Sequence, residues 1–148
     1  MSLKQKITDD LKEAMRAGNT KQRDTIRLLQ AAIKQREVDE RITLDDAAII
    51  AVIDKMLKQR KDSITQYEAA KRSDLAEIEK DEVAILTAYM PQALTEAEID
   101  TLIAEAISAS GARNMQEMGR VMAILKPQLS GRADMGTVSA LIKAKLSA

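Results

Sequence analysis

The sequence predicts an all-α protein, built from a four-helix N-terminal part followed by a small three-helix C-terminal domain. Apolar residues recur at helical spacing along most of the chain, and few runs alternate with the period of two that strands show. Gly and Pro number only five and two in 148 residues, so long helices can run uninterrupted. With two Tyr and no Phe or Trp, the core must consist of aliphatic side chains and Met, which suits closely packed helices.

Capping residues and helix-breaking residues place the boundaries, and they predict an N-terminal helical domain at 1–90 and a C-terminal domain at 95–148. The four N-terminal helices are expected at 2–17, from about 20 onward, at 43–70 and at 73–90. Asn19 resembles the start of a capping box, and Thr43 is a suitable N-cap for the third helix. Pro91 should end the fourth helix, because the residue before a proline disfavours helical backbone.

Three further capping positions predict the helices of the C-terminal domain. Thr95 and Glu98 form a capping box that opens the first of them. Asn114 should open the second, and Asp134 should cap the third. Gly131 should close the corner between these last two helices. A unit of about 50 residues buries little surface and is only marginally stable by itself.

The charge balance and the missing residue types exclude several functions. The 23 basic and 23 acidic residues cancel, so no global basic field attracts nucleic acid. Without Cys or His, the chain lacks disulfides, thiolate catalysis, zinc–sulfur sites and the commonest general base. No apolar run approaches the roughly 20 residues of a membrane span, and the N-terminus lacks the apolar core of a signal peptide. We therefore expect a cytoplasmic protein with no membrane association, no metal, no cofactor, no catalytic residues and no intrinsic enzymatic activity.

One arginine interrupts the apolar stripe of the third helix. Arg60 lies between Met56 and Ile64, where a charged side chain would be desolvated. A planar guanidinium in such a place requires a carboxylate partner. Glu79 and Glu82 lie on or beside the stripe of the fourth helix. We expect a structural ion pair among these residues, and a ligand-binding arginine is the alternative.

The C-terminal domain is polarised in charge along its sequence. Residues 96–112 hold four acids and no base, whereas residues from 113 onward hold six bases and two acids. A glycine lets the backbone approach a partner closely, and the N-terminus of a helix offers N–H groups to anions. These features are typical of a surface that docks phosphate groups, but composition alone favours a plain helix–helix corner with a left-handed glycine. The expected phosphate-docking residues are Arg120, Lys126, Gly131 and Arg132.

Four segments, in the same order, resemble the GatB/YqeY family. They are LKEAMRAGNTKQRDTIRLLQAAIK, LKQRKDSITQYEAAKRSDLAEIE, ILTAYMPQAL and MGRVMAILKPQLSGRADMGTVSALIKAKL. The last is similar to the tail domain of the B subunit of the tRNA-dependent amidotransferase. The resemblance implies an all-helical fold in two parts and a C-terminal part that contacts tRNA through shape and backbone. The catalytic domain and glutaminase subunit of that enzyme have no counterpart among these residues.

The expected function is that of a non-catalytic accessory protein with a tRNA-docking helical tail, related to the tRNA-dependent amidotransferase. Its expected partners are tRNA or another protein of the aminoacyl-tRNA pathway. A protein–protein adaptor is the alternative reading. A component of a glutamine-dependent carbon–nitrogen ligase is the least favoured.

Overall fold

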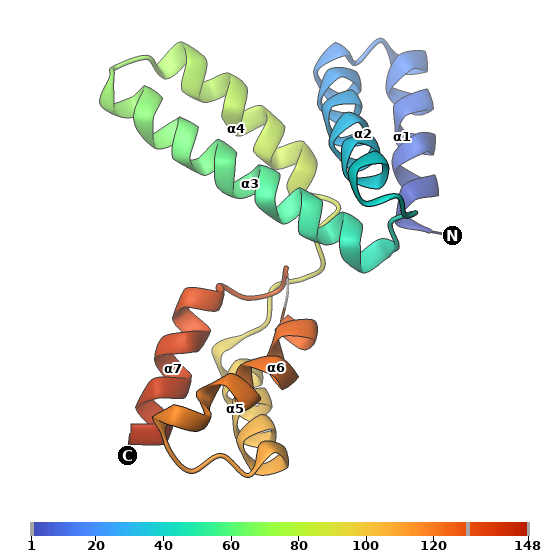
Figure 1. Cartoon of the computed structure of the whole chain (residues 1–148). Coiled ribbons are helices and arrows are strands. Elements are labelled where there is room, and N and C mark those ends of the chain that lie inside the picture. Colours follow the sequence, from blue (N-terminus) through green and yellow to red (C-terminus); the bar gives the residue numbers. More distant parts are fainter. Residues whose placement is uncertain (1, 130, 148) are drawn as a thin grey trace. The chain divides into compact units, whose positions relative to one another are not determined.

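The computed structural model describes residues 2–129 and 131–147, and every regular element in this part is a helix (Figure 1). The α-helices are α1 (Leu3–Ala17), α2 (Thr20–Glu40), α3 (Asp46–Ala69), α4 (Ser73–Thr87), α5 (Glu96–Ser110), α6 (Met118–Leu129) and α7 (Met135–Ser147). The expected all-α class is therefore confirmed. Across the described ranges, no helix combines the length and the apolar character needed to cross a membrane. The chain divides into two compact units, one ending at Met90 and the other beginning at Pro91.

Local capping explains where the first two helices begin and where the first ends. The Ser2 hydroxyl accepts a hydrogen bond from the Gln5 N–H at 3.1 Å, and the Asn19 side chain accepts one from the Gln22 N–H at 3.1 Å. Between them, Gly18 has a φ of +68°, a left-handed conformation that glycine adopts without steric cost. This corner turns α1 back against α2.

The third helix begins later than Thr43, the N-cap expected from the sequence. Asp45 is the N-cap instead, and its side chain accepts a hydrogen bond from the Ala48 N–H at 2.9 Å. A contact with another helix explains this later start. Leu44 is buried, and its N–H donates to a carboxylate oxygen of Glu37 on α2, at 2.9 Å. This contact holds residue 44 outside the helix, so helical backbone starts only after it.

The fourth helix ends at Thr87, three residues before the expected Met90. After it, the Tyr89 N–H donates to the Leu86 carbonyl and the Met90 N–H donates to the Thr87 carbonyl, which tightens the chain into a turn. The turn directs Tyr89 inward, where its hydroxyl donates to Asp10 Oδ2 of α1 at 2.6 Å. Burial and this hydrogen bond both raise the pKa of the Tyr89 hydroxyl. The end of α4 is thus held against α1.

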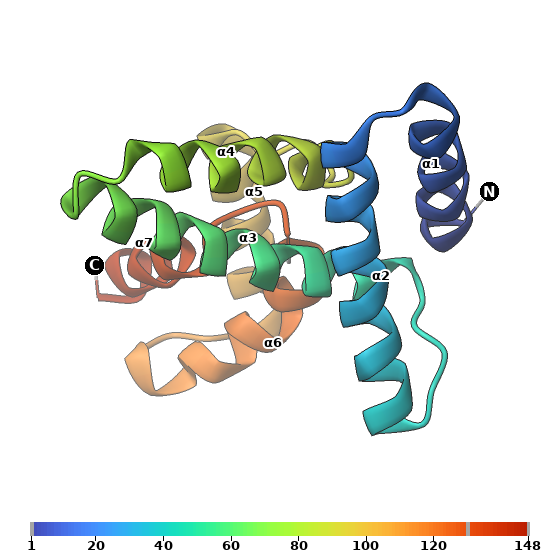
Figure 2. The ribbon, with the colours of Figure 1, turned by 90° about the horizontal axis from the view of Figure 1, so that it is seen from above.

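The N-terminal unit combines two helical hairpins. Helices α3 and α4 lie side by side, and α2 contacts both of them as well as α1 (Figures 1 and 2). The side chains that meet between these helices are almost entirely aliphatic. The buried cluster contains Ile7, Ile26, Leu29, Ile33, Leu44, Ile49, Ile53, Met56, Leu57, Leu86 and Tyr89.

In the C-terminal unit, three helices enclose a separate core. The capping box of Thr95 and Glu98 opens α5 as expected. Asn114 caps a short 3-10 turn (Met115–Glu117) rather than α6, which begins at Met118. The buried cluster contains Ile103, Ala106, Ala112, Val121, Leu125, Leu129, Val138, Ile142 and Leu146.

Candidate functional site

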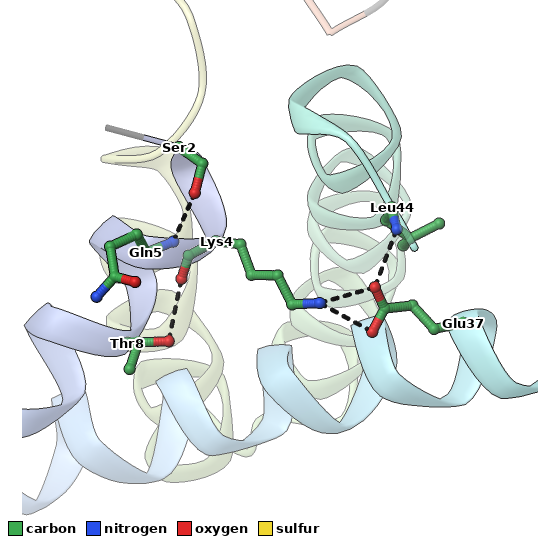
Figure 3. Close-up of polar contacts among 6 residues, drawn as sticks. All are labelled: Ser2, Lys4, Gln5, Thr8, Glu37 and Leu44. Atoms are coloured by element: carbon green, nitrogen blue, oxygen red, sulfur yellow. Dashed lines mark hydrogen bonds and ion pairs between the residues drawn. The ribbon is translucent and has the colours of Figure 1, made fainter. Parts of the chain in front are cut away.

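One carboxylate joins three segments of the N-terminal unit (Figure 3). Lys4 Nζ on α1 donates to both oxygens of Glu37 on α2, at 3.1 and 2.8 Å. The Leu44 N–H, in the link to α3, donates to Glu37 Oε2. A small pocket of about 260 Å³ lies beside this cluster, between α1 and α2. The hydrogen bond from Lys4, followed by that from Leu44, lowers the pKa of the Glu37 carboxyl, so the group is a poor general base.

The lowered pKa makes this cluster a source of acid sensitivity. A carboxyl whose pKa is lower in the folded state stabilises the fold above its ordinary pKa of 4.5. That stabilisation is lost as the pH falls through the folded-state pKa. We expect the melting temperature of the wild type to fall more steeply below pH 4.5 than that of Glu37→Gln, as measured by circular dichroism. Glu13→Gln, at an exposed position of α1, should follow the wild type; parallel curves for wild type and Glu37→Gln would contradict the assignment.

The structure brings Arg60 together with both expected carboxylates in the α3–α4 hairpin. Arg60 Nε donates to Glu82 Oε2 at 2.7 Å and lies 4.0 Å from Glu79 Oε2. Its Nη1 also donates to the Met56 carbonyl at 3.5 Å. The Arg60 side chain is only 13% exposed, and its two partners are 22% and 21% exposed. The guanidinium is therefore used within the hairpin, where it joins α3 to α4.

The corner between α6 and α7 differs from its expected form. Gly131 has a φ of +76°, a left-handed conformation. The Arg132 and Ala133 N–H groups both donate to the Leu129 carbonyl, at 2.9 and 3.1 Å. Asp134 Oδ2 accepts from the Thr137 N–H at 2.9 Å and so caps α7. The N–H groups expected to receive an anion are thus used internally, because the Asp134 carboxylate takes the place that an anion would occupy.

The expected basic residues of this corner do not converge on one point. Arg132 Nε donates to the Gln92 carbonyl at 3.3 Å, which directs the guanidinium toward the segment before α5. Lys126 lies in the last turn of α6 rather than in the corner, because the helix continues past Pro127 to the buried Leu129. Arg120 and Lys126 are both exposed on α6. These two side chains remain accessible for binding.

The two units differ in how their charges are paired. Among residues 2–129 and 131–147, all ion pairs within 4.0 Å lie between Lys4 and Glu82, in the N-terminal unit. In the described part of the C-terminal unit, no base lies that close to a described carboxylate. These bases are Arg113, Arg120, Lys126, Arg132, Lys143 and Lys145. Because none of these bases is neutralised by a carboxylate of the described part, their positive charge is available to a ligand.

A groove along α5 is a feature that the sequence analysis did not single out. It has a volume of about 430 Å³, and Arg132 forms part of its lining. Glu98 and Glu105 contribute acidic groups, and Leu94 and Leu102 contribute apolar surface. Intervals of four, four and three residues separate Leu94, Glu98, Leu102 and Glu105, and this spacing could have shown that they share a face. The position of Arg132 opposite them depends on the tertiary fold.

The chain resembles known proteins over nearly its full length. The family described as Yqey-like protein matches residues 4–146. A protein of Pyrenophora tritici-repentis named "Altered inheritance of mitochondria protein 41, mitochondrial" is 35% identical over 126 residues, which cover 82% of this chain and 70% of that protein. The protein of the same name from Lachancea thermotolerans is 38% identical over 105 residues, which cover 69% and 56% of the two chains. The chain spans only about half the length of most such relatives.

The names of these relatives correct the cellular location that was expected from the sequence. The relatives are named as mitochondrial proteins, so the expectation of a cytoplasmic protein is wrong on this comparison. That expectation rested on the absence of an apolar segment. Such an absence excludes neither an organelle nor any other aqueous compartment.

Proposed function

The chain belongs to the Yqey-like protein family, and from this premise we propose that it is an accessory protein, without a catalytic centre of its own, that docks on tRNA. The docking surface consists of the exposed bases of α6 and α7 together with the corner between these helices. Arg120 and Lys126 supply phosphate contacts, and Gly131 and Arg132 shape the corner beside them. The similarity to the tail of the tRNA-dependent amidotransferase subunit supports this choice of ligand.

The observation that carries the proposal is the set of bases without ion-pair partners in the C-terminal unit. Lys and Arg bind phosphate oxygens through charge-assisted hydrogen bonds, and each contact releases counterions from the nucleic acid. A base that is already paired with a carboxylate would have to give up that pair first. Among the described residues, the bases of α6 and α7 have no such pair to break. Most bases of the α3–α4 hairpin, such as Arg60 and Lys80, are paired with a carboxylate.

The expected binding is weak and directed to backbone and shape. Both aromatic residues of the chain, Tyr67 and Tyr89, lie in the N-terminal unit, so the C-terminal unit has no side chain on which bases could stack. Phosphate contacts position a protein on nucleic acid without reading its sequence. With few contacts, the logarithm of the binding constant should fall gently with the logarithm of salt concentration, by about 0.9 per contact on duplex.

Charge reversal on α6 tests the proposal. We expect Arg120→Glu combined with Lys126→Glu to abolish the binding of fluorescently labelled tRNA, measured by anisotropy over a salt series. Both positions are exposed, so the helical circular dichroism should persist. The matched control is Lys12→Glu with Lys61→Glu, which makes the same change of charge at exposed positions of the N-terminal unit. Equal loss of tRNA binding in both double variants would show a non-specific effect of charge and would refute the proposed docking surface.

A protein adaptor is the second candidate, and the groove along α5 favours it. Its apolar lining from Leu94 and Leu102, flanked by Glu98 and Glu105, suits a basic amphipathic segment of another protein. The tRNA titration separates the two functions. Absence of tRNA binding by the wild type at low salt would refute the docking surface on α6. The adaptor function would then be the remaining candidate.

A further inference from the structure

The groove between α2 and α3 belongs to neither surface discussed above. It has a volume of about 500 Å³. Ala32 on α2 contributes to its floor, together with Ala51, Val52 and Met56 on α3. The small alanine side chains let another helix approach closely, since the distance between packed helices depends on the side chains at the contact. The groove thus has an apolar floor of the kind that suits the side of a helix.

The two walls of this groove carry opposite charges. On the α2 wall, Arg36 pairs with Glu40, so these two charges offset each other. Asp39 therefore gives that wall a net negative charge. It accepts a hydrogen bond at 2.9 Å from the Gln35 amide of the same helix, which is neutral and does not offset this charge. On the α3 wall, Lys55 is exposed and forms no ion pair with a described residue. The groove therefore presents an acid on one wall and a base on the other.

A half-exposed leucine extends the apolar surface of α2. Leu28 is 49% exposed and so adds apolar surface to this side of the helix. It precedes Ala32, Gln35 and Asp39 by four, seven and eleven residues, and helical spacing places these side chains along one stripe. The same stripe of α2 thus begins with an uncovered leucine and ends with the acid of the groove wall.

We propose that this face binds a second copy of the chain, with α2 of each copy lying in the groove of the other. A twofold contact pairs each surface with itself, so every group must find its complement on the same face. Leu28 of the entering helix covers the apolar floor, and its Asp39 approaches Lys55 on the far wall. Because both charges and the leucine occur twice, the contact forms two ion pairs and buries two leucines. This charge complementarity between the walls favours a second copy over an unrelated partner.

Measurement of molar mass against concentration, by light scattering after size exclusion, tests the proposal. We expect the wild type to form dimers and Leu28→Asp to be monomeric at the same concentrations. Lys55→Asp should weaken the dimer at least about tenfold, because two ion pairs become two repulsive contacts. Asp39→Lys combined with Lys55→Asp should restore it, since the swap recreates both pairs.

The control is Met15→Asp, which places the same acid on α1 at a methionine that is 54% exposed and outside the groove. Its mass should equal that of the wild type, and circular dichroism should show equal helicity in all variants. A wild type that stays monomeric at every concentration overturns the proposal, as does a dimer that tolerates Leu28→Asp. Failure of the charge swap to restore the Lys55→Asp variant would also refute the pairing of the walls.

Discussion

Arg60→Ala is expected to lower the free energy of unfolding of the N-terminal unit by about 3 kcal/mol, because it leaves Glu82 and Glu79 without their counter-charge. For a unit of this size, a loss of that order lowers the melting temperature by more than about 10 °C. The expected cost lies at the lower end of the range for buried pairs, since the Arg60 side chain retains 13% exposure. Thermal melts of the full chain, followed by tyrosine fluorescence, provide the measurement.

Two further variants separate the ion pair from a general effect of losing an arginine. Arg72→Ala removes an exposed arginine whose partner, Asp74, is 65% exposed, and it should hardly change the melting temperature. Replacing both members of the buried pair, as Arg60→Met with Glu82→Leu, should recover much of the lost stability. The Glu82 carboxylate is then absent and no longer lies unpaired. A melting temperature of Arg60→Ala that matches the wild type would show that the pair contributes nothing.

The features that the sequence predicted well depend on neighbours along the chain. Asn19 caps α2, and Thr95 opens α5 through its capping box. Arg60 could be placed against α4 because a charge within an apolar stripe requires a partner, and the stripes of two consecutive helices face each other. Local rules were sufficient for these positions, since each one involves a helix end or a helix face.

The features that the sequence could not give depend on contacts between distant segments. The start of α3 shifted from Thr43 to Asp45 because the Leu44 N–H is held by Glu37, seven residues away. The Arg132 side chain, expected to bind phosphate, donates to the Gln92 carbonyl forty residues away. The groove between α2 and α3 results from how two helices cross. No spacing rule within one helix predicts such a crossing.

The positions of the two tyrosines allow the units to be followed separately. Tyr67 and Tyr89 both lie in the N-terminal unit, and the chain has no Trp. Tyrosine fluorescence therefore reports on that unit, whereas circular dichroism reports on the helices of both. Because each unit encloses its own apolar core, we propose that the two fold independently of each other.

Under this proposal, Ile142→Asp should unfold the C-terminal unit and leave the N-terminal unit intact. Ile142 has no exposed surface, and a carboxylate there would lie unpaired among aliphatic side chains. The lost packing and the desolvated charge together cost about 5 kcal/mol or more. A unit of this size has a total stability of roughly 3–9 kcal/mol, so most of that stability is lost. Part of the helical signal should disappear, while the tyrosine transition keeps the wild-type midpoint.

The control for this experiment is Lys143→Asp, which introduces the same residue at the adjacent, exposed position of α7 and should leave both signals unchanged. The reciprocal variant, Ile53→Asp, should abolish the tyrosine transition, because Ile53 is buried in the core of the N-terminal unit. The remaining helical signal of that variant should then come from α5, α6 and α7. If Ile142→Asp lowers the midpoint of the tyrosine transition together with the helical signal, the two cores unfold as one cooperative unit, and independent folding is refuted.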